Sequence, residues 1–161
     1  ATPIVHAGYV FVSAAGRGRS TTSGSALVKL EAGDDGVTAK EVYHISDLAN
    51  HHGGVVRVGD YLYGTNNTSL LCIDFKTGAT KWQNRSVGKG SVTAADGCLY
   101  VRGENGKVVL VEATPSGYKE KGRFDQPDRS AKLAWPHPVI AGGRLYLRDQ
   151  DVLLCFDVKE K

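Results

Sequence analysis

Residues 54–63 read GVVRVGDYLY, and the same ten-residue pattern occurs three more times in the chain. The other copies, aligned without gaps, are TPIVHAGYVF (2–11), SVTAADGCLY (91–100) and HPVIAGGRLY (137–146). Each copy has a short run rich in β-branched residues, then a turn-forming pair, then an aliphatic residue at its ninth position and an aromatic residue at its tenth. Pairs such as Asp96-Gly97 suit two-residue hairpin loops, which need positive φ. Each copy therefore predicts a β-hairpin.

A third apolar strand that ends in an acidic residue follows each hairpin. These strands are ALVKLE to Glu31, LLCID to Asp74, VVLVE to Glu112 and VLLCFD to Asp157. In the first three units a turn and a more polar fourth strand come next, namely VTAKEVYHI, ATKWQN and YKEKGRF. An acid placed before a turn can accept hydrogen bonds from the turn amides, which accounts for its recurrence without a catalytic role. The units are therefore predicted to be four-stranded meanders.

The spacing of the four units indicates how they are arranged. They start at residues 2, 54, 91 and 137, which lie 52, 37 and 46 residues apart, near the repeat length of propeller blades. One four-stranded sheet buries too little apolar surface alone, so neighbouring sheets must stack around a common axis. We therefore expect an all-β fold, a single β-propeller domain with blades at roughly 2–49, 53–88, 90–130 and 136–161.

The fourth unit stops at FDVKEK and has no outer strand in this sequence. Ring propellers leave no open edge, because a strand from elsewhere completes the last blade. We therefore expect this chain to be part of a larger ring of about seven or eight blades. The missing blades would come from upstream sequence or from another chain.

Composition and charge exclude several classes of partner. The 161 residues carry a formal charge of +3, from 20 basic and 17 acidic residues spread along the chain, which predicts no nucleic-acid partner. No apolar run approaches the roughly 18 residues of a membrane-spanning helix, so no membrane span is predicted. Cys72, Cys98 and Cys155 form no CxxC or zinc-binding spacing, and their apolar strand contexts predict buried free thiols.

The stretch CIDFKTGATKW (72–82) resembles the tryptophan-docking motif of the PQQ-binding-like β-propeller repeats, the superfamily of the quinoproteins and the BamB-like propellers. Asp74, Thr77, Gly78 and Trp82 match the motif, and Cys72 stands where the family usually has alanine. The resemblance implies that the tryptophan docks against the neighbouring blade and that Thr-Gly builds the turn between the outer strands. Only the second unit carries the full motif. The resemblance also implies a bacterial protein that is periplasmic, attached to the cell envelope or secreted.

Quinoprotein alcohol dehydrogenases share this resemblance, so an enzymatic role has to be weighed. In that family an adjacent Cys-Cys pair lies beneath the cofactor, and Glu, Asn and Asp bind Ca²⁺. This chain has no Cys-Cys pair, and its Asn66-Asn67 pair has no matching acid. It also lacks the GxSxG, HExxH and phosphate-loop motifs. The sequence predicts no catalytic residue.

Three functions remain open from the sequence. The favoured one is a non-catalytic scaffold that needs no cofactor and binds a protein or peptide. The alternative is an oxidoreductase that depends on a transition metal or on PQQ with Ca²⁺. A second alternative is a structural subunit of an extracellular assembly, which would add a strand to the open edge at DVLLCFDV.

The histidine pair His51-His52 lies directly ahead of the second unit, and His137 opens the fourth. In a propeller the first strand of each blade lines the central channel, so these residues are predicted at one mouth of that channel. Lys89 and Trp135 lead into the third and fourth units in the same way. Loops at such a mouth can vary without disturbing blade packing, so these five residues form the predicted protein- or peptide-binding rim.

The histidines allow two interpretations at this mouth. The imidazoles of His52 and His137, if they converge on the channel, can bind a transition metal or a ligand carboxylate. In the structural alternative each histidine caps a strand end by a hydrogen bond to a neighbouring carbonyl. The sequence leaves both interpretations open.

Overall fold

The computed structural model describes residues 2–16 and 23–159, which form four antiparallel sheets and no helix. The first sheet contains β1 (Ile4–His6), β2 (Tyr9–Ala14), β3 (Gly24–Gly33) and β4 (Gly36–Ile45). The second contains β5 (Val55–Val58), β6 (Tyr61–Thr65), β7 (Leu70–Asp74) and β8 (Thr80–Asn84). The third contains β9 (Gly90–Ala95), β10 (Cys98–Gly103), β11 (Lys107–Glu112) and β12 (Glu120–Asp125). The fourth contains β13 (Val139–Ala141), β14 (Arg144–Asp149) and β15 (Val152–Asp157).

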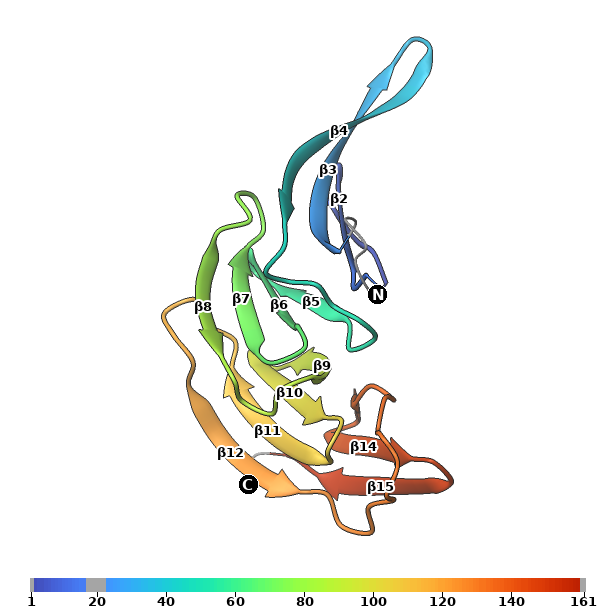
Figure 1. The fold of residues 1–161 in the computed structure, drawn as a ribbon, viewed down its shortest axis with the longest axis vertical. Helices are drawn as coiled ribbons and strands as arrows, with labels where there is room; N and C mark the ends of the chain where they lie inside the picture. The colour runs from blue at the N-terminus through green and yellow to red at the C-terminus, as the bar shows by residue number, and fades with distance from the viewer. Residues whose placement is uncertain (1, 17–22, 160–161) are drawn as a thin grey trace.

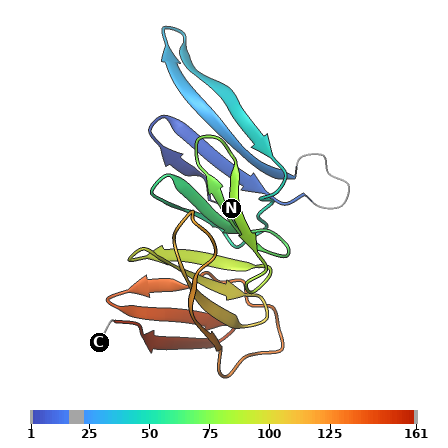
Figure 2. The same ribbon diagram turned by 90° about the vertical axis from the view of Figure 1, so that its left-hand side faces the viewer.

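The sheets follow one another as propeller blades do. In each sheet the strands are ordered as in the sequence, and Figures 1 and 2 show the four sheets stacked in chain order. Neighbouring sheets meet through their first strands, because β1 contacts β5, β5 contacts β9 and β9 contacts β13. The expected fold, an all-β propeller of four-stranded antiparallel blades with a three-stranded last sheet, is confirmed.

The hairpins within the sheets form as the sequence predicts. Asp96 and Gly97 connect β9 to β10 with φ values of 48° and 71°, in the left-handed region that such a two-residue turn requires. Ala7 and Gly8 adopt the same conformation between β1 and β2, with φ values of 48° and 79°. Each turn pair is followed by a second strand. Because side chains alternate along a strand, its aliphatic and aromatic positions lie on opposite faces of the sheet.

The outer hairpin of the first sheet differs from the prediction that its third strand ends at Glu31. The β3–β4 ladder continues to the pair Gly33 and Gly36, where Gly36 has a φ of 118°. This end of the hairpin extends away from the other sheets, at the top of Figure 1. Because the ladder continues past it, the Glu31 carboxylate lies on an exposed strand and pairs with Lys29 Nζ at 2.6 Å. It does not serve as a turn acid.

Asp74 shows the turn arrangement that the sequence predicts. Its Oδ1 accepts hydrogen bonds from the backbone N–H of Lys76 at 3.0 Å and of Thr77 at 2.9 Å. Partial burial opposes ionisation of this carboxyl, but the bonds from Thr77 and Lys76 outweigh it and hold the pKa of Asp74 below its ordinary value. Gly78, with a φ of 73°, completes the turn.

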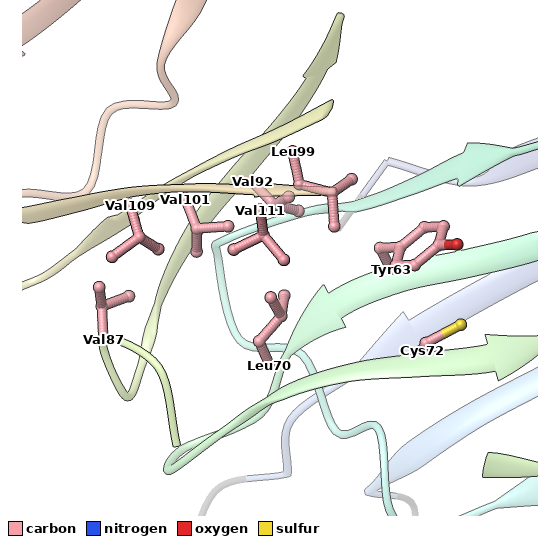
Figure 3. Packing of buried hydrophobic residues seen from close by; sticks show 9 residues of the cluster. All are labelled: Tyr63, Leu70, Cys72, Val87, Val92, Leu99, Val101, Val109 and Val111. Atoms are coloured by element: carbon pink, nitrogen blue, oxygen red, sulfur yellow. The ribbon is translucent and has the colours of Figure 1, made fainter. Parts of the chain in front are cut away.

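The seam between the second and third sheets is apolar. Tyr63, Leu70 and Cys72 face a layer of aliphatic side chains from the third sheet, shown in Figure 3: Val92, Leu99, Val101, Val109 and Val111. Trp82 packs at the edge of this cluster, and its Nε1 donates a hydrogen bond to the Thr114 carbonyl of the third sheet at 2.7 Å. Burying an aromatic side chain of this size stabilises a fold by about 3 kcal/mol.

An aromatic side chain from each outer strand packs in the seam with the next sheet. Tyr43 on β4 packs against the core of the second sheet, and its hydroxyl donates to the Phe75 carbonyl at 3.0 Å. Phe124 on β12 contacts Phe156 of the fourth sheet, with ring centroids 5.1 Å apart. Trp82 occupies the same place in the second sheet. The tryptophan motif is therefore one form of a contact that all three outer strands make.

The seam between the third and fourth sheets also contains a buried charged cluster, here called the Asp149 network. Arg102 on β10 is fully buried and donates to the Arg148 carbonyl at 2.6 Å and to the Gln126 side chain. Asp149 accepts from Gln126 Nε2 at 3.0 Å and from Ser130 Oγ at 2.7 Å, and it lies 3.9 Å from Arg102 Nη2. The sequence analysis did not find this network.

The prediction of three buried thiols is wrong for two of them. Cys72 is buried, Cys98 is half-buried and Cys155 is exposed. Cys155 lies on β15, where its neighbours Leu154 and Phe156 pack toward the third sheet. Because side chains alternate along a strand, Cys155 points to the opposite face, which no other described sheet covers.

Nothing in the part of the chain that the structure describes forms a helix with the length and apolar character needed to cross a membrane.

Candidate binding site

The five predicted rim residues lie in loops that lead into the first strands of three sheets. His51 and His52 precede β5, Lys89 precedes β9, and Trp135 and His137 precede β13. The structure brings all five together around Glu104, in the loop between β10 and β11. We call this group the rim site.

Glu104 is the centre of the rim site. Its Oε1 accepts a hydrogen bond from Trp135 Nε1 at 2.9 Å, and it lies 3.2 Å from Lys89 Nζ and 3.1 Å from His52 Nε2. The Glu104 side chain is 17% exposed. One carboxylate oxygen thus binds side chains from two of these loops, through Trp135 and Lys89, and lies against His52 of a third.

His52 is packed between the other rim residues. Its ring lies against Trp135, with centroids 5.0 Å apart, and its Nδ1 is 3.0 Å from His51 Nδ1. Its Nε2 approaches Glu104 without hydrogen-bond geometry and has no hydrogen-bond partner among the described residues. Burial and the neighbouring Lys89 charge outweigh the attraction of Glu104 and hold the pKa of His52 below its ordinary value.

His137 makes the contact that the structural alternative describes. Its Nε2 lies 2.8 Å from the His52 backbone carbonyl, and since a carbonyl only accepts, the Nε2 carries the proton. The two imidazoles therefore do not converge through their Nε2 atoms. Across residues 2–16 and 23–159, no three His, Cys, Asp or Glu side chains are grouped so that they could hold a metal ion. The metal site at His52 and His137 and the alternative cofactor, PQQ with Ca²⁺, stay predictions.

Two glycines let the histidine segment approach the third and fourth sheets. A Cβ at Gly53 would lie 1.8 Å from the Gly90 carbonyl oxygen, and the Gly53 carbonyl accepts from Val92 N–H at 3.0 Å. Gly54 has a φ of 71°, and a Cβ there would lie 2.6 Å from His137 Cε1. Close approach therefore favours glycine at both positions.

The segment that carries Trp135 is fixed by its backbone. Ala134 is buried, and its N–H donates to the Glu104 carbonyl at 3.3 Å. Ser91 Oγ donates to the Trp135 carbonyl at 3.1 Å. On either side of Ala134, Leu133 is 53% exposed and Trp135 is 52% exposed. A rigid backbone thus presents two large apolar side chains to solvent.

Two cavities lie beside these apolar side chains and share Leu133. The first, of about 240 Å³, is also lined by Val87, Lys89, Glu104, Asn105 and Arg129. The second, of about 500 Å³, is also lined by Ala131, Lys132, Trp135 and Gln150.

Sequence reasoning missed Glu104 and Leu133. Glu104 follows β10, and the end of β10 lies beside the start of β9, since Gly103 pairs with Gly90. In an antiparallel sheet, the loop that follows the second strand therefore lies at the same end of the sheet as the loop that leads into the first strand. The topology alone could have placed Glu104 on the predicted rim. Leu133 lies in an irregular segment that has no repeat pattern to place it.

The residues of the tryptophan motif do not belong to the rim site. Asp74, Thr77 and Gly78 form the β7–β8 turn, at the end of the sheet opposite the loop that contains Lys89. Trp82 lies in the seam with the third sheet. The first three residues therefore shape a turn, and Trp82 holds two blades together.

Comparison with known proteins supports the β-propeller fold. No protein-family model matches the chain, and no curated protein matches its sequence. Among solved structures, BamB from Moraxella catarrhalis is similar over 96% of this chain and 42% of its own, with a TM-score of 0.66 and 14% identity. The N-terminal domain of Nup159 is similar over 91% of this chain and 38% of its own, with a TM-score of 0.59 and 15% identity.

A europium-containing methanol dehydrogenase is similar over 72% of this chain and 23% of its own, with 12% identity, but its TM-score of 0.48 is too low to support an argument. The chain thus spans less than half the length of each of these structures. It has a β-propeller fold similar to that of BamB, and at these identities the likeness defines the fold alone.

Proposed function

We propose that this chain is a non-catalytic binding module, related to the PQQ-binding-like propellers, whose rim site holds a segment of a protein partner. The observation that carries the proposal is the convergence of three loops on Glu104, whose hydrogen bond with the half-exposed Trp135 places that ring at the wall of a cavity of about 500 Å³. Tryptophan is enriched among the residues that dominate binding energy at protein interfaces.

The geometry of Trp135 suits an anchor of this kind. Its indole N–H is already satisfied by Glu104, so a partner can cover the ring without leaving a buried donor unpaired. Its backbone is held by Ser91, so little conformational freedom is lost on binding. Since Glu104 Oε1 contacts Trp135, Lys89 and His52, its role in this proposal is to position these side chains.

The test is selection of peptides from a displayed random library against the immobilised chain, followed by affinity measurements on the selected peptides by fluorescence anisotropy. A central tryptophan anchor contributes about 2 kcal/mol or more, so Trp135→Ala is expected to weaken binding by about 30-fold. Val37→Ala is the control, because Val37 is 69% exposed but lies on β4, away from the rim site and from β15. Selected peptides that bind Trp135→Ala as well as the unchanged chain would overturn the proposal.

We also propose that the protein works outside the cytoplasm, in the periplasm or at the cell envelope. The support is the resemblance of Asp74, Thr77, Gly78 and Trp82 to the tryptophan-docking motif, together with the BamB-like fold. Fractionation of the source cells, with immunodetection of the protein, tests this. Recovery in the cytoplasmic fraction would contradict it.

The edge of β15 is a second candidate surface, for a partner that adds a strand. β15 is the last strand of its sheet, and a cavity of about 210 Å³ lined by Phe124, Leu145 and Val158 lies between this sheet and the third. A proline at Leu153 would disturb such pairing while leaving the rim site intact. Unchanged partner binding by Leu153→Pro, provided that the variant folds, would remove this candidate.

A further inference from the structure

We infer that the rim site is specific for an acidic peptide segment, in which a large apolar side chain covers Trp135 and Leu133 and flanking carboxylates meet Lys89, Arg129 and Lys132. This inference rests on the proposed function and adds the chemistry of the ligand. Its support is the charge and the apolar surface around the two cavities.

Basic side chains outnumber acidic ones in the cavity walls. Lys89 and Arg129 line the smaller cavity, and Lys132 lines the larger one. Glu104 is the one acidic residue in either lining, and its Oε1 already contacts Lys89, His52 and the Trp135 indole. Asp128 and Asp151 are exposed nearby in sequence but line neither cavity. The net charge facing a ligand is therefore positive.

Arg129 and Lys132 are placed to receive that ligand. In the part of the chain that the structure describes, neither forms an ion pair. The aliphatic stem of Arg129 lies on the β10–β11 loop, since a Cβ at Gly106 would be 2.6 Å from Arg129 Cδ. A guanidinium placed in this way can donate two parallel hydrogen bonds to one carboxylate, a pairing that is both stronger and more directional than a lysine contact.

Each cavity combines these charges with apolar side chains. Leu133 lines both cavities, Trp135 lines the larger one, and Val87 lines the smaller one. A ligand that spans both cavities therefore meets apolar surface and at least one basic side chain in each of them. Exposed apolar surface bordered by polar residues is typical of protein interaction sites. A purely acidic ligand would leave Trp135 and Leu133 uncovered, and a purely apolar one would leave the cations unpaired.

Three synthetic peptides test the inference: Gly-Ser-Asp-Leu-Phe-Glu-Ser-Gly, a version with lysine in place of both acids, and a version with serine in place of Leu and Phe. Each carries a fluorescent label, and its affinity is measured by anisotropy at low salt and at high salt. The acidic apolar peptide is expected to bind at least about tenfold more tightly than either of the others. Its affinity is expected to fall by a few fold at high salt, since exposed charges are screened.

Charge reversal in the protein sharpens the test. Arg129→Glu and Lys132→Glu are each expected to weaken binding of the acidic peptide and to strengthen binding of the lysine peptide. Lys40→Glu changes the net charge by the same amount on the exposed β4 strand and is the matched control. An equal effect of Lys40→Glu would show a general charge effect and overturn the inference.

The outcomes separate the inference from the proposed function. If the lysine peptide binds as well as the acidic one, the inference is wrong, while the proposed function stands as long as Trp135→Ala weakens binding. If no designed peptide binds and the library selects non-acidic peptides that depend on Trp135, the same conclusion holds. If selected peptides do not depend on Trp135, the proposed function fails and the inference fails with it.

Discussion

The Asp149 network and the rim site are both built around a carboxylate, and they differ in how far the residues around that carboxylate are exposed to solvent. Asp149 is 1% exposed, and its partners Arg102, Gln126 and Ser130 come from the protein itself. Glu104 also has its partners in the protein, but one of them, Trp135, leaves 52% of its surface in solvent. A closed network of this kind can only hold two sheets together, whereas an open one can also hold a partner.

The difference extends to the protonation behaviour of the two regions. Burial opposes ionisation of Asp149, but hydrogen bonds from Ser130 and Gln126 and the charge of Arg102 outweigh it and hold its pKa below the ordinary value. At the rim, burial and Lys89 hold the pKa of His52 below its ordinary value, so the neutral ring is favoured. The network therefore stabilises a charge, and the rim stabilises a neutral imidazole.

The largest effect is expected when the closed network is broken. Asp149→Ala leaves the fully buried Arg102 without its compensating charge, which should lower the free energy of unfolding by about 3–5 kcal/mol. Urea unfolding followed by circular dichroism measures this. Asp157→Ala, an exposed acid in the same sheet, is the control and should cost less than about 0.5 kcal/mol. A loss below about 1 kcal/mol for Asp149→Ala would contradict the structural role of the network.

The two tryptophans give the next largest contrast. Trp82→Ala removes packing in the seam between the second and third sheets and leaves the Thr114 carbonyl without its donor, so it should cost about 3 kcal/mol. Trp135→Ala, at the open rim, should cost about 1 kcal/mol or less. Both losses of stability are measured from the midpoints of urea unfolding curves, provided that the dependence of the unfolding free energy on urea concentration is unchanged. Equal losses for the two variants would mean that the rim is as much a part of the core as the seam.

A smaller effect is expected at Glu104. Glu104→Ala removes the acceptor of the half-exposed Trp135 indole and should lower the free energy of unfolding by about 1 kcal/mol, the usual net contribution of one hydrogen bond. The Trp135 ring should become more mobile, which lowers its fluorescence anisotropy in a Trp82→Phe background. The background protein with Glu104 intact is the reference. If Trp135 is equally immobile without Glu104, the carboxylate does not position the ring.

The smallest effect is the pH dependence of the rim. Because the pKa of His52 is lowered on folding, the unfolded chain takes up a proton first as pH falls below about 6.5, and stability is lost in that window. Asp149, whose pKa is also lowered, contributes stability that is lost only as pH falls below about 4. His52→Gln should reduce the loss between pH 7 and pH 5 and leave the loss below pH 4 unchanged. The reverse pattern in urea titrations would show that His52 is protonated in the folded protein.

Much of the fold could be predicted because it depends on local sequence patterns that repeat along the chain. The turn pairs, the alternation in each second strand and the acid before the turn each reflect the strand period or turn chemistry, and Asp96-Gly97 and Asp74 behave as expected. The rim could also be predicted in part, because every loop that leads into the first strand of a blade lies at the same end of the propeller. His51, His52, Lys89, Trp135 and His137 were brought together by that rule alone.

What could not be predicted depends on contacts between distant segments. Arg102 and Asp149 occupy ordinary strand positions, and nothing local shows that they face each other in a seam. The exposure of Cys155 depends on which face of β15 another sheet covers. Glu104 is one loop acid among several, and it stands out only when three loops from different sheets are seen to meet on it.

The most direct test of the contrast between the closed network and the open rim is a map of backbone amide chemical shifts in the ¹⁵N-labelled protein as a selected peptide is added. Shifts are expected in the rim loops at 50–54, 85–89, 103–106 and 129–137. The side-chain indole N–H of Trp135, which appears in the same spectrum, is expected to show one of the largest. Shifts confined to β15, or to the hairpin turns at the opposite end of the sheets, would contradict it.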